Sequence, residues 1–274
     1  MNRPPANTER PPRGLSRPGG PCGPEPGGGS PGPSGCRWTV ERLHGRVADL
    51  LERAEPPADT ARSARIHVVE APCLVLGSTQ GFQTVDQGRA AAAGVEVTRR
   101  RSGGGAVLLS PGSQVWVDFF IPDSDPLWSN DVAHAALWVG ELWAEVIEPF
   151  ATGPASIHSG RLVADRWGRL VCFAGTGPGE VFVRGLKVVG VSQRRSRQRV
   201  RIQTTVRLQH PPAAASDETA RRSLDEFELL DITPEERVMG RAEMAHRGGS
   251  IAATEAELTE SLLGALEAQA TGSR

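Results

Sequence analysis

Apolar residues recur at helical spacing in three separate parts of the chain. The first is TVERLHGRVADLLERA, in which valine and leucine stand three and four positions apart behind Thr39, a suitable helix cap. A second run, DVAHAALWVGELWAEVIE, repeats this spacing and has Asn130 or Asp131 as its cap. An alanine-rich run ends at Gly94, and glycine commonly terminates helices. These patterns predict helices over residues 39–54, 85–94 and 131–148.

Short apolar runs elsewhere are typical of buried strands. Three of them, IHVVE, PCLVLG and VEVTRR, lie before residue 101. Residues 107–109 and 115–122 predict two antiparallel strands joined by a turn at Pro111-Gly112. After Leu162 the runs RLVCFAG, EVFVRG, LKVVGVSQ and QRVRIQTTVRLQ predict a series of antiparallel hairpins. Because strands and helices mix without strict β-α-β alternation, we expect an α+β fold with a mainly antiparallel sheet flanked by helices.

The two ends of the chain differ from its middle. The first 36 residues contain 10 Pro and 9 Gly without a regular period, a composition that cannot bury a core. From about Ser216 onward, acidic and apolar residues alternate in helical registers, most clearly in LTESLLGALEAQ. We therefore divide the chain into a disordered tail, a catalytic domain and a helical C-terminal segment, at residues 1–36, 37–212 and 213–274.

Charge and composition exclude several classes of function. A net charge of -1 provides no general field for a nucleic acid or an anionic membrane, so we expect neither as a partner. No apolar run is long enough to span a bilayer or to form a signal peptide, which predicts a cytoplasmic protein. The scattered cysteines indicate reduced thiols and no metal site; they are Cys22, Cys36, Cys73 and Cys172.

Lys187 is the only lysine among 31 basic residues. Arginine supplies positive charge anywhere else in the chain, but it cannot replace a compact ammonium or an amine with a tunable pKa. Codon bias with one accidental survivor would explain the count equally well. The lysine follows a turn at Gly185-Leu186, from which we expect it to reach a glycine-rich loop at Gly103. A cation there would stabilise the oxyanion formed in acyl transfer.

The glycine-rich loop belongs to the motif TRRRSGGGAV. Three bare glycines allow amide groups to approach an anionic or carbonyl oxygen, and Arg99, Arg100 and Arg101 add donors for a carboxylate or phosphate. A flexible surface hairpin is the alternative interpretation. Cys172, in LVCFAG, is the candidate nucleophile, because a thiol beside a cation can form a thioester. A small buried hydrophobic residue is its alternative role, and Cys73 fits that role better.

Taken together, three motifs resemble those of lipoate–protein ligases. RRRSGGGAV is similar to their RRxxGGGAV signature, GLKVVGVSQRR to their lysine loop, and LVLGSTQ to the strand before the arginine pair. The stretch from VCFAG to SQRR looks even more like the octanoyltransferase branch of this biotin/lipoate ligase superfamily. The resemblance covers roughly residues 71 to 209 and implies the superfamily's catalytic-domain fold.

The resemblance also implies roles for individual residues. Lys187 would contact the acyl carbonyl or acyl phosphate, and Cys172 would carry the acyl group. The remaining residues of the matched motifs would bind substrate, with the triple glycine lining the acyl and nucleotide pocket: Arg99, Arg100, Ser102, Gly103, Gly104, Gly105, Ala106, Gly190 and Gln193. The chain departs from the ligase pattern at two places. Leu109-Ser110 stands where ligases have a His-Asp pair, so any role of that pair is lost or moved. Val171 to Phe173 stands where ligases tend to have an Arg-Asn-Asp stretch, which weakens the ATP-dependent interpretation.

Three functions remain open at this point. In the first, Cys172 takes an octanoyl or lipoyl group from an acyl carrier protein and passes it to the lysine of a lipoyl domain. In the second, ATP with Mg and free lipoate or octanoate form an acyl-adenylate, and Cys172 is incidental. The third is a non-catalytic acyl-binding protein. Arg195, Arg197, Arg199 and Arg201 recur every second residue, which indicates either a docking stripe for an acidic protein or a solvated face.

Overall fold

The computed structural model describes residues 37–57, 60–209 and 224–271. The expected disordered tail at residues 1–36 lies outside the described residues, together with Cys22, Cys36 and the ends of the expected C-terminal segment at residues 213–223 and 272–274. The proposed division of the chain into a tail, a catalytic domain and a C-terminal segment stays a prediction.

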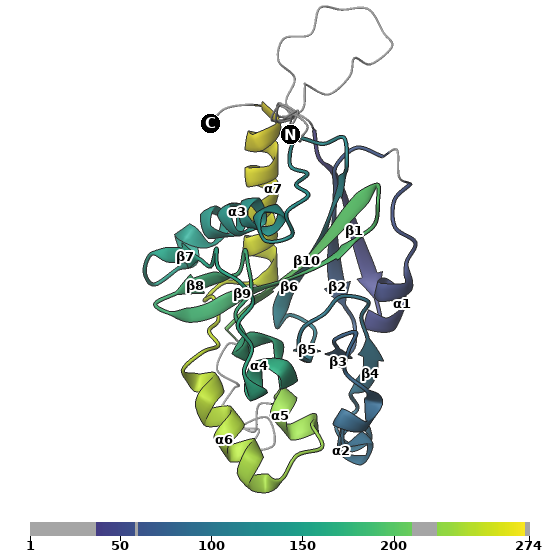
Figure 1. Ribbon diagram of the computed structural model, residues 1–274, viewed down its shortest axis with the longest axis vertical. Helices are drawn as coiled ribbons and strands as arrows, with labels where there is room; N and C mark the ends of the chain where they lie inside the picture. The colour runs from purple at the N-terminus through teal and green to yellow at the C-terminus, as the bar shows by residue number, and fades with distance from the viewer. Residues whose placement is uncertain (1–36, 58–59, 210–223, 272–274) are drawn as a thin grey trace, which may run out of the picture.

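Seven strands form the main sheet, in the order β1-β2-β6-β10-β9-β8-β7 (Figure 1). Strands β1 and β2 are parallel, and the other neighbouring strands of this sheet are antiparallel. The strands are β1 Thr39–Gly45, β2 Ser63–Val69, β6 Gln114–Pro122, β7 Ala155–Ile157, β8 Val181–Val183, β9 Leu186–Arg195 and β10 Arg199–Arg207. The expected α+β fold with a mainly antiparallel sheet is confirmed, and so are the hairpins of β8, β9 and β10.

A second sheet has three strands in the order β4-β3-β5. These strands are β3 Cys73–Leu76, β4 Glu96–Arg99 and β5 Val107–Leu109. Strand β3 is parallel to β4 and antiparallel to β5. Side chains of β3 and β5 pack with Trp116 of β6 in one hydrophobic cluster. This cluster joins the small sheet to one face of the main sheet.

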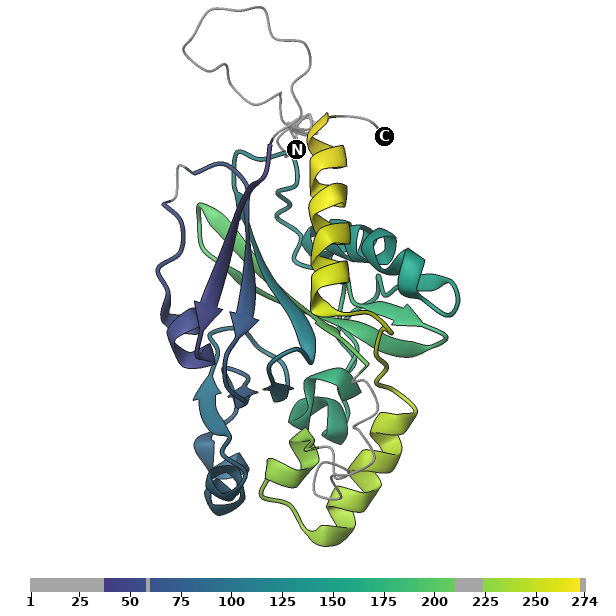
Figure 2. The ribbon, with the colours of Figure 1, turned by 180° about the vertical axis from the view of Figure 1, so that it is seen from behind.

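Two long helices cover the opposite face of the main sheet (Figure 2). They are α3 Leu137–Ile147 and α7 Glu255–Thr271. The shorter helices are α1 Val47–Glu52, α2 Gln87–Ala92, α4 Arg166–Leu170, α5 Glu226–Leu229 and α6 Pro234–Ala245. Asp131 accepts hydrogen bonds from the amides of Ala133 and His134, which begin the 3-10 turn before α3. No helix in the described ranges is long and apolar enough to cross a membrane.

Alternation along β6 separates the two faces of the main sheet. Val115, Val117 and Phe119 belong to the core under α3 and α7. Trp116 and Asp118 point to the other face, because successive side chains of a strand alternate. Every residue of β6 is buried, so this strand carries a core on both faces. The candidate site lies on the face of the main sheet to which Trp116 points.

The expected helix over residues 39–54 is wrong in its first half. Residues Thr39–Gly45 form strand β1 beside β2, and α1 begins only at Val47. The hydrophobic spacing in this segment reflects Val47 and Leu50, the two buried residues of the short helix. Parallel pairing with β2 satisfies the backbone of the preceding residues, and this contact is not visible in the local pattern.

The expected hairpin between residues 107–109 and 115–122 is also wrong. Strand β5 pairs with β3 in the small sheet, whereas β6 pairs with β2 and β10 in the main sheet. The turn at Pro111-Gly112 exists, since the Ser113 amide donates to the Ser110 carbonyl at 3.0 Å and Gly112 has a φ of 69°. It redirects the chain from one sheet to the other.

The segment RLVCFAG is not a strand. Helix α4 occupies residues Arg166–Leu170, and a single 3-10 turn, η4, follows at Cys172–Ala174. The Asp165 carboxylate accepts the Gly168 amide at 2.9 Å and so caps α4. A Cβ on Gly168 would lie 2.8 Å from the Gly175 Cα, so α4 and the end of the η4 turn are in close backbone contact.

The alternating arginines do not form an exposed stripe. Arg199 and Arg201 are buried, and their guanidinium groups bind the Thr60 carbonyl and the Asp118 carboxylate. Arg195 ends β9, and Arg197 lies in the turn before β10, so these two precede the strand. The interpretation as one docking face is therefore wrong.

Candidate active site

A pocket of about 450 Å³, including its opening to solvent, lies between the two sheets. Strands β3 and β5 form one wall, and β6, β9 and β10 form the other. The lining is mostly apolar, with a few polar groups, as in many sites for small ligands. It consists of Leu51, Val75, Arg100, Val107, Leu109, Trp116, Cys172, Phe173, Gly190, Val191, Ser192, Gln203 and Thr205.

Cys172 begins the η4 turn, lines this pocket and is partly exposed as a free thiol. Its amide donates to the Ala106 carbonyl at 2.8 Å, and the Ala106 amide donates to Leu170 at 2.8 Å. The glycine motif and the cysteine turn, far apart in the sequence, are thus directly hydrogen-bonded. Ala106 therefore acts through its backbone, because its own side chain is fully buried.

Lys187 lies beneath the cysteine turn and is only 1% exposed. Its Nζ donates to the Cys172 carbonyl at 2.8 Å and to the Gly175 carbonyl at 3.2 Å. The same Nζ forms an ion pair with Glu180 at 2.6 Å. These three acceptors match the three protons of an ammonium. The sequence-based prediction placed Lys187 against the loop at Gly103, but its bonds are to the cysteine turn and Glu180.

Glu180 is buried beside Lys187 and accepts the amides of Gly177 at 2.7 Å and Val191 at 3.3 Å. Burial raises the pKa of Glu180, although the charge of Lys187 and these hydrogen bonds oppose the rise. The pair forms a fixed unit at the base of the η4 turn. Phe173 covers it, with its ring centroid 5.3 Å from the lysine Nζ.

Arg100 brings the other buried positive charge to the site. It donates to the carbonyls of Val75 at 3.3 Å, Gly103 at 2.7 Å and Gly105 at 2.9 Å. Burial lowers the pKa of Arg100, whereas the nearby Cys172 acts to raise it. Arg100 also lines the pocket, so its guanidinium can stabilise negative charge on a group bound there.

The triple glycine is shaped by close contacts on two sides. A Cβ on Gly105 would lie 2.6 Å from the Val171 carbonyl carbon, and a Cβ on Gly77 would lie 1.8 Å from the Gly104 oxygen. Gly104 has a φ of 97°, a conformation that glycine readily adopts. Among the described hydrogen bonds, none uses the amides of residues 103–105 as donors. Gly103 and Gly104 are exposed, which leaves their amides open to an oxygen of a ligand, whereas Gly105 is buried.

Ser102 connects the loop to the floor of the pocket. Its hydroxyl donates to Gln203 Oε1 at 2.8 Å and lies 3.0 Å from the Ser192 hydroxyl. Gly190 lies on the same floor, where a Cβ would be 3.5 Å from Phe173 and 3.6 Å from Lys187 Cε. Ser102 and Gly190 therefore contribute to the same site as the loop and the cysteine turn.

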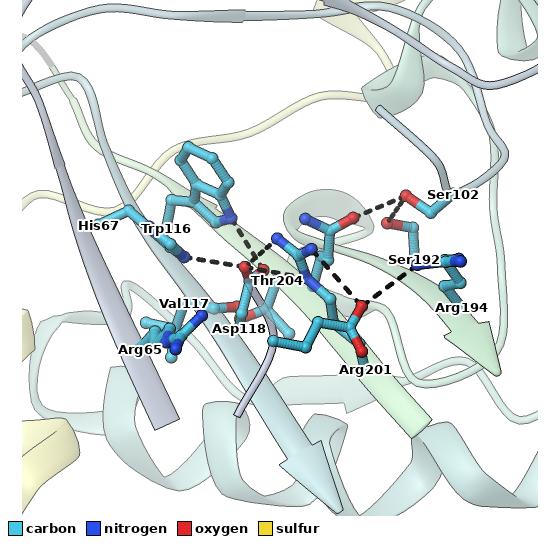
Figure 3. A network of polar contacts seen from close by, with 12 residues as sticks. Arg65, His67, Ser102, Trp116, Val117, Asp118, Ser192, Arg194, Arg201 and Thr204 are labelled. Carbon is cyan, nitrogen blue, oxygen red and sulfur yellow. Dashed lines mark hydrogen bonds and ion pairs between the residues drawn. The ribbon is translucent and has the colours of Figure 1, made fainter. Parts of the chain in front are cut away.

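A buried polar network stands behind the pocket wall formed by Trp116 (Figure 3). The Asp118 carboxylate accepts hydrogen bonds from Trp116 Nε1 at 3.1 Å and from Arg201 Nε at 3.1 Å. It also lies 2.8 Å from His67 Nε2. The His67 ring stacks on Trp116 with centroids 4.1 Å apart. Burial acts to raise the pKa of Asp118, but the charges and hydrogen bonds of His67 and Arg201 outweigh it and lower the pKa. The indole wall is thus fixed by its neighbours.

Of the predicted binding residues, Arg100 and Gly190 line this pocket, whereas Ser102, the glycines at 103–105 and Ala106 do not, and Arg99 and Gln193 make other contacts. Arg99 is exposed, and its guanidinium lies over the Phe82 ring at 5.6 Å. Gln193 points its amide to the Val132 carbonyl at 2.6 Å. Neither residue lines the pocket. Cys73 is fully buried, as expected for a small core residue, and burial raises its pKa to about 12.

The sequence analysis missed Glu180 and the Asp118 network. Asp118 is the single acid in the apolar run QVWVDFFIP, and an isolated acid in a buried strand is a signal that could have identified it. Glu180 lacks such a signal, because its partner Lys187 is seven residues away across a β-hairpin. No cluster of three or more acidic, histidine or cysteine residues in the described ranges could hold a metal ion.

Comparisons with known proteins relate the chain to one family and to a known fold. Residues 54–211 match the family described as the lipoyl protein ligase A/B catalytic domain. A bipartite lipoate protein ligase of Thermoplasma acidophilum superposes with a TM-score of 0.61 at 11% identity, over 85% of this chain and 83% of that chain. LipL1 of P. falciparum in complex with lipoate gives 0.52 at 11% identity, over 86% and 63%. A lipoate–protein ligase A bound with ATP gives 0.50 at 14% identity, over 85% and 94%. Comparison with curated protein sequences finds no match.

Proposed function

The chain belongs to the lipoyl protein ligase A/B catalytic domain family, and from this premise we propose that it transfers an octanoyl or lipoyl group through a thioester on Cys172. The acceptor is the lysine of a lipoyl domain, and the donor is an acyl carrier protein. One observation carries the proposal: the free thiol of Cys172 lines a mostly apolar pocket beside the buried guanidinium of Arg100.

The reaction has two acyl-transfer steps. In the first, the Cys172 thiolate attacks the carbonyl carbon of the donor thioester, a new C–S bond forms, and the carrier thiolate leaves and takes up a proton. In the second, the acceptor amine attacks the acyl-Cys172 carbonyl, an amide C–N bond forms, and the cysteine thiolate is released as the amine loses a proton. No oxidant or nucleotide is consumed.

Arg100 and the glycine loop supply the electrostatic part of this mechanism. Negative charge develops on the acyl oxygen in both steps, and fixed donors around that oxygen accelerate acyl transfer. The guanidinium of Arg100, which lines the pocket and is bonded to the Gly103 and Gly105 carbonyls, is the group that supports this role, and the exposed amides of Gly103 and Gly104 are the further donors proposed for it. The apolar lining around Val107 and Leu109 would hold the acyl chain.

Lys187 supports the reaction by holding the nucleophile in place. Its ammonium binds the carbonyls at both ends of the turn, Cys172 and Gly175, and Glu180 anchors it from below. A guanidinium is planar and larger, so it would not fit the same three acceptors in a site that is 1% exposed. This requirement explains why lysine occupies this position in a chain that otherwise uses arginine.

The second candidate function is ATP-dependent ligation through an acyl-adenylate. The observation that favours it is the set of unused amides at residues 103–105, because such a loop also suits the oxygens of a phosphate. In that case free lipoate or octanoate, ATP and Mg would be the substrates, and Cys172 would only line the pocket. The acceptor lysine would be the same.

Intact mass spectrometry separates the two routes. The protein is incubated with octanoyl carrier protein without ATP, or with octanoate, ATP and Mg, and each sample is also run as Cys172→Ser. An octanoyl adduct that requires no ATP and disappears in the serine variant supports the thioester route. Adenylate formation that persists in Cys172→Ser supports the ligase. If neither sample yields an adduct or an adenylate, both routes are wrong.

A further inference from the structure

The segment after α6 is hydrogen-bonded to the backbone of Lys187. The Lys187 amide donates to the Arg247 carbonyl at 2.7 Å, and the Gly249 amide donates to the Lys187 carbonyl at 2.8 Å. These two bonds form a parallel bridge between Lys187 and Gly248. The C-terminal segment thus pairs with the beginning of β9, at the residue whose side chain reaches the cysteine turn.

The side chain of Arg247 reaches the cysteine turn itself. Its Nη1 donates to the Ala174 carbonyl at 3.2 Å and to Asp165 at 2.8 Å, and its Nη2 donates to Glu243 at 2.7 Å. Asp165 caps α4, the helix that leads directly into the turn. The hydrogen bonds to these carboxylates raise the pKa of Arg247, in keeping with a firmly held cation.

Two cationic side chains therefore donate hydrogen bonds to different carbonyl groups of the same turn. Lys187 binds the oxygens of Cys172 and Gly175, and Arg247 binds the oxygen of Ala174. Arg247 also holds the backbone of Lys187, so it is connected to both candidate catalytic residues. Residue 247 lies beyond the matched family range, which ends at 211.

We propose that Arg247 is a positioning residue that sets the orientation of Cys172 in the acyl pocket. The expected effect on Cys172 acylation rests on the proposed function. The expected effect on the position of Cys172 does not. Misplacing a nucleophile by about 1 Å can cost roughly 100-fold in rate, so a contact at the far end of its turn can affect catalysis without touching substrate.

A simpler role for Arg247 would be a general positive charge near the C-terminal end of α6. A lysine would satisfy that role, because the charge of a helix dipole does not require a fork of donors. Positioning requires donors to Asp165, Glu243 and Ala174 at once, and only the arginine fork can provide them in fixed directions. The two roles therefore differ in what Arg247→Lys does.

The experiment compares Arg247→Met and Arg247→Lys in the full chain with Arg241→Met as the matched control. Arg241 lies on α6, the helix that precedes Arg247, and also holds two carboxylates, Asp225 and Glu228, but the described contacts do not connect it to the cysteine turn. Alkylation by iodoacetamide is followed at each cysteine by peptide mass. The buried Cys73 reports global unfolding, because it reacts only when the core opens.

In Arg247→Met and Arg247→Lys, we expect Cys172 alkylation to rise about tenfold with Cys73 still protected, and the rate of Cys172 acylation by octanoyl carrier protein to fall about 10- to 100-fold. Arg241→Met should stay within about twofold of wild type in both measurements. The proposal is overturned if Arg247→Met alkylates at or below the wild-type rate, if Arg241→Met shows the same change, or if Arg247→Lys restores wild-type behaviour.

Failure of the proposed function gives a different result. If wild-type protein forms no acyl-Cys172 but the alkylation rates differ as expected, the thioester route is wrong and the positioning role of Arg247 stands. If wild-type acylation occurs and the alkylation rates do not differ, the thioester route stands and the positioning role is wrong.

Discussion

The ammonium of Lys187 donates to the carbonyl oxygen of Cys172 at 2.8 Å. The lysine thus holds the main chain of the proposed nucleophile, and the Gly175 carbonyl and the Glu180 carboxylate are the other two acceptors of its ammonium. A group with all its donors engaged acts first as a structural anchor. Arg100, which lines the pocket, is the cation proposed to act on the acyl oxygen.

Breaking the Lys187–Glu180 pair should be costly. Lys187→Met leaves the Glu180 carboxylate buried without its partner, which we expect to lower the free energy of unfolding by about 3–5 kcal/mol. Urea denaturation followed by circular dichroism measures this change. The double variant Lys187→Met/Glu180→Leu should recover most of the loss, since neither charge is then left unpaired. A single variant as stable as wild type would contradict this account of the pair.

Asp118 should make the free energy of unfolding depend on pH in the acid range. Its pKa lies well below that of an ordinary aspartate, so its contribution to stability is fully present above the ordinary pKa and is lost as the pH falls through the folded-state pKa. Asp118→Asn should therefore be destabilised at pH 7 by about 1–3 kcal/mol, and the difference from wild type should shrink toward pH 2. Urea midpoints measured from pH 7 to pH 2 test this.

Asp123→Asn is the control for this pH dependence, because Asp123 is exposed at the end of the same strand. Its difference from wild type should be small at every pH. A constant difference between wild type and Asp118→Asn across the whole range would show that the Asp118 charge does not contribute.

Trp116 should limit the length of the acyl chain. Its indole forms a pocket wall that Asp118 and His67 hold in place. Trp116→Ala should shift the preference toward longer acyl donors, with discrimination between neighbouring chain lengths changing by about 10-fold or more. Rates measured with hexanoyl, octanoyl, decanoyl and dodecanoyl donors give this profile. Trp38→Leu, a change in the core on the opposite face, should leave the profile unshifted.

The contact between the glycine loop and the cysteine turn should tolerate no side chain at Gly105. A methyl group there would meet the Val171 and Cys172 backbones at 2.6 to 2.8 Å, whereas at Gly103 it would meet nothing within 4 Å. We expect Gly105→Ala to lower the melting temperature by about 4 °C or more, and Gly103→Ala to change it little. Equal melting temperatures for the two variants would show that the turns separate easily.

Local patterns predicted much of the fold correctly. Alternating apolar residues in EVFVRG, LKVVGVSQ and QRVRIQTTVRLQ specify strands whose short connections leave only antiparallel pairing, and β8, β9 and β10 follow it. The helical spacing before residue 148 specifies α3 in the same way. The glycine, cysteine and lysine motifs also pointed to segments that are hydrogen-bonded to one another in the structure, through Ala106, Cys172 and Lys187.

The tertiary structure decided what these residues contact. Strand β1 needs β2 as a partner, and η4 depends on the bridge from Val171 to Ala106, so neither could be read from its own segment. Glu180, Asp118 and Arg247 gain their roles from neighbours that only folding brings near. The sequence by itself determined which groups are candidates for the chemistry, because residue type sets charge and reactivity. Folding decided that Lys187 holds the turn and Arg100 lines the pocket, because direction and burial depend on contacts distant in the chain.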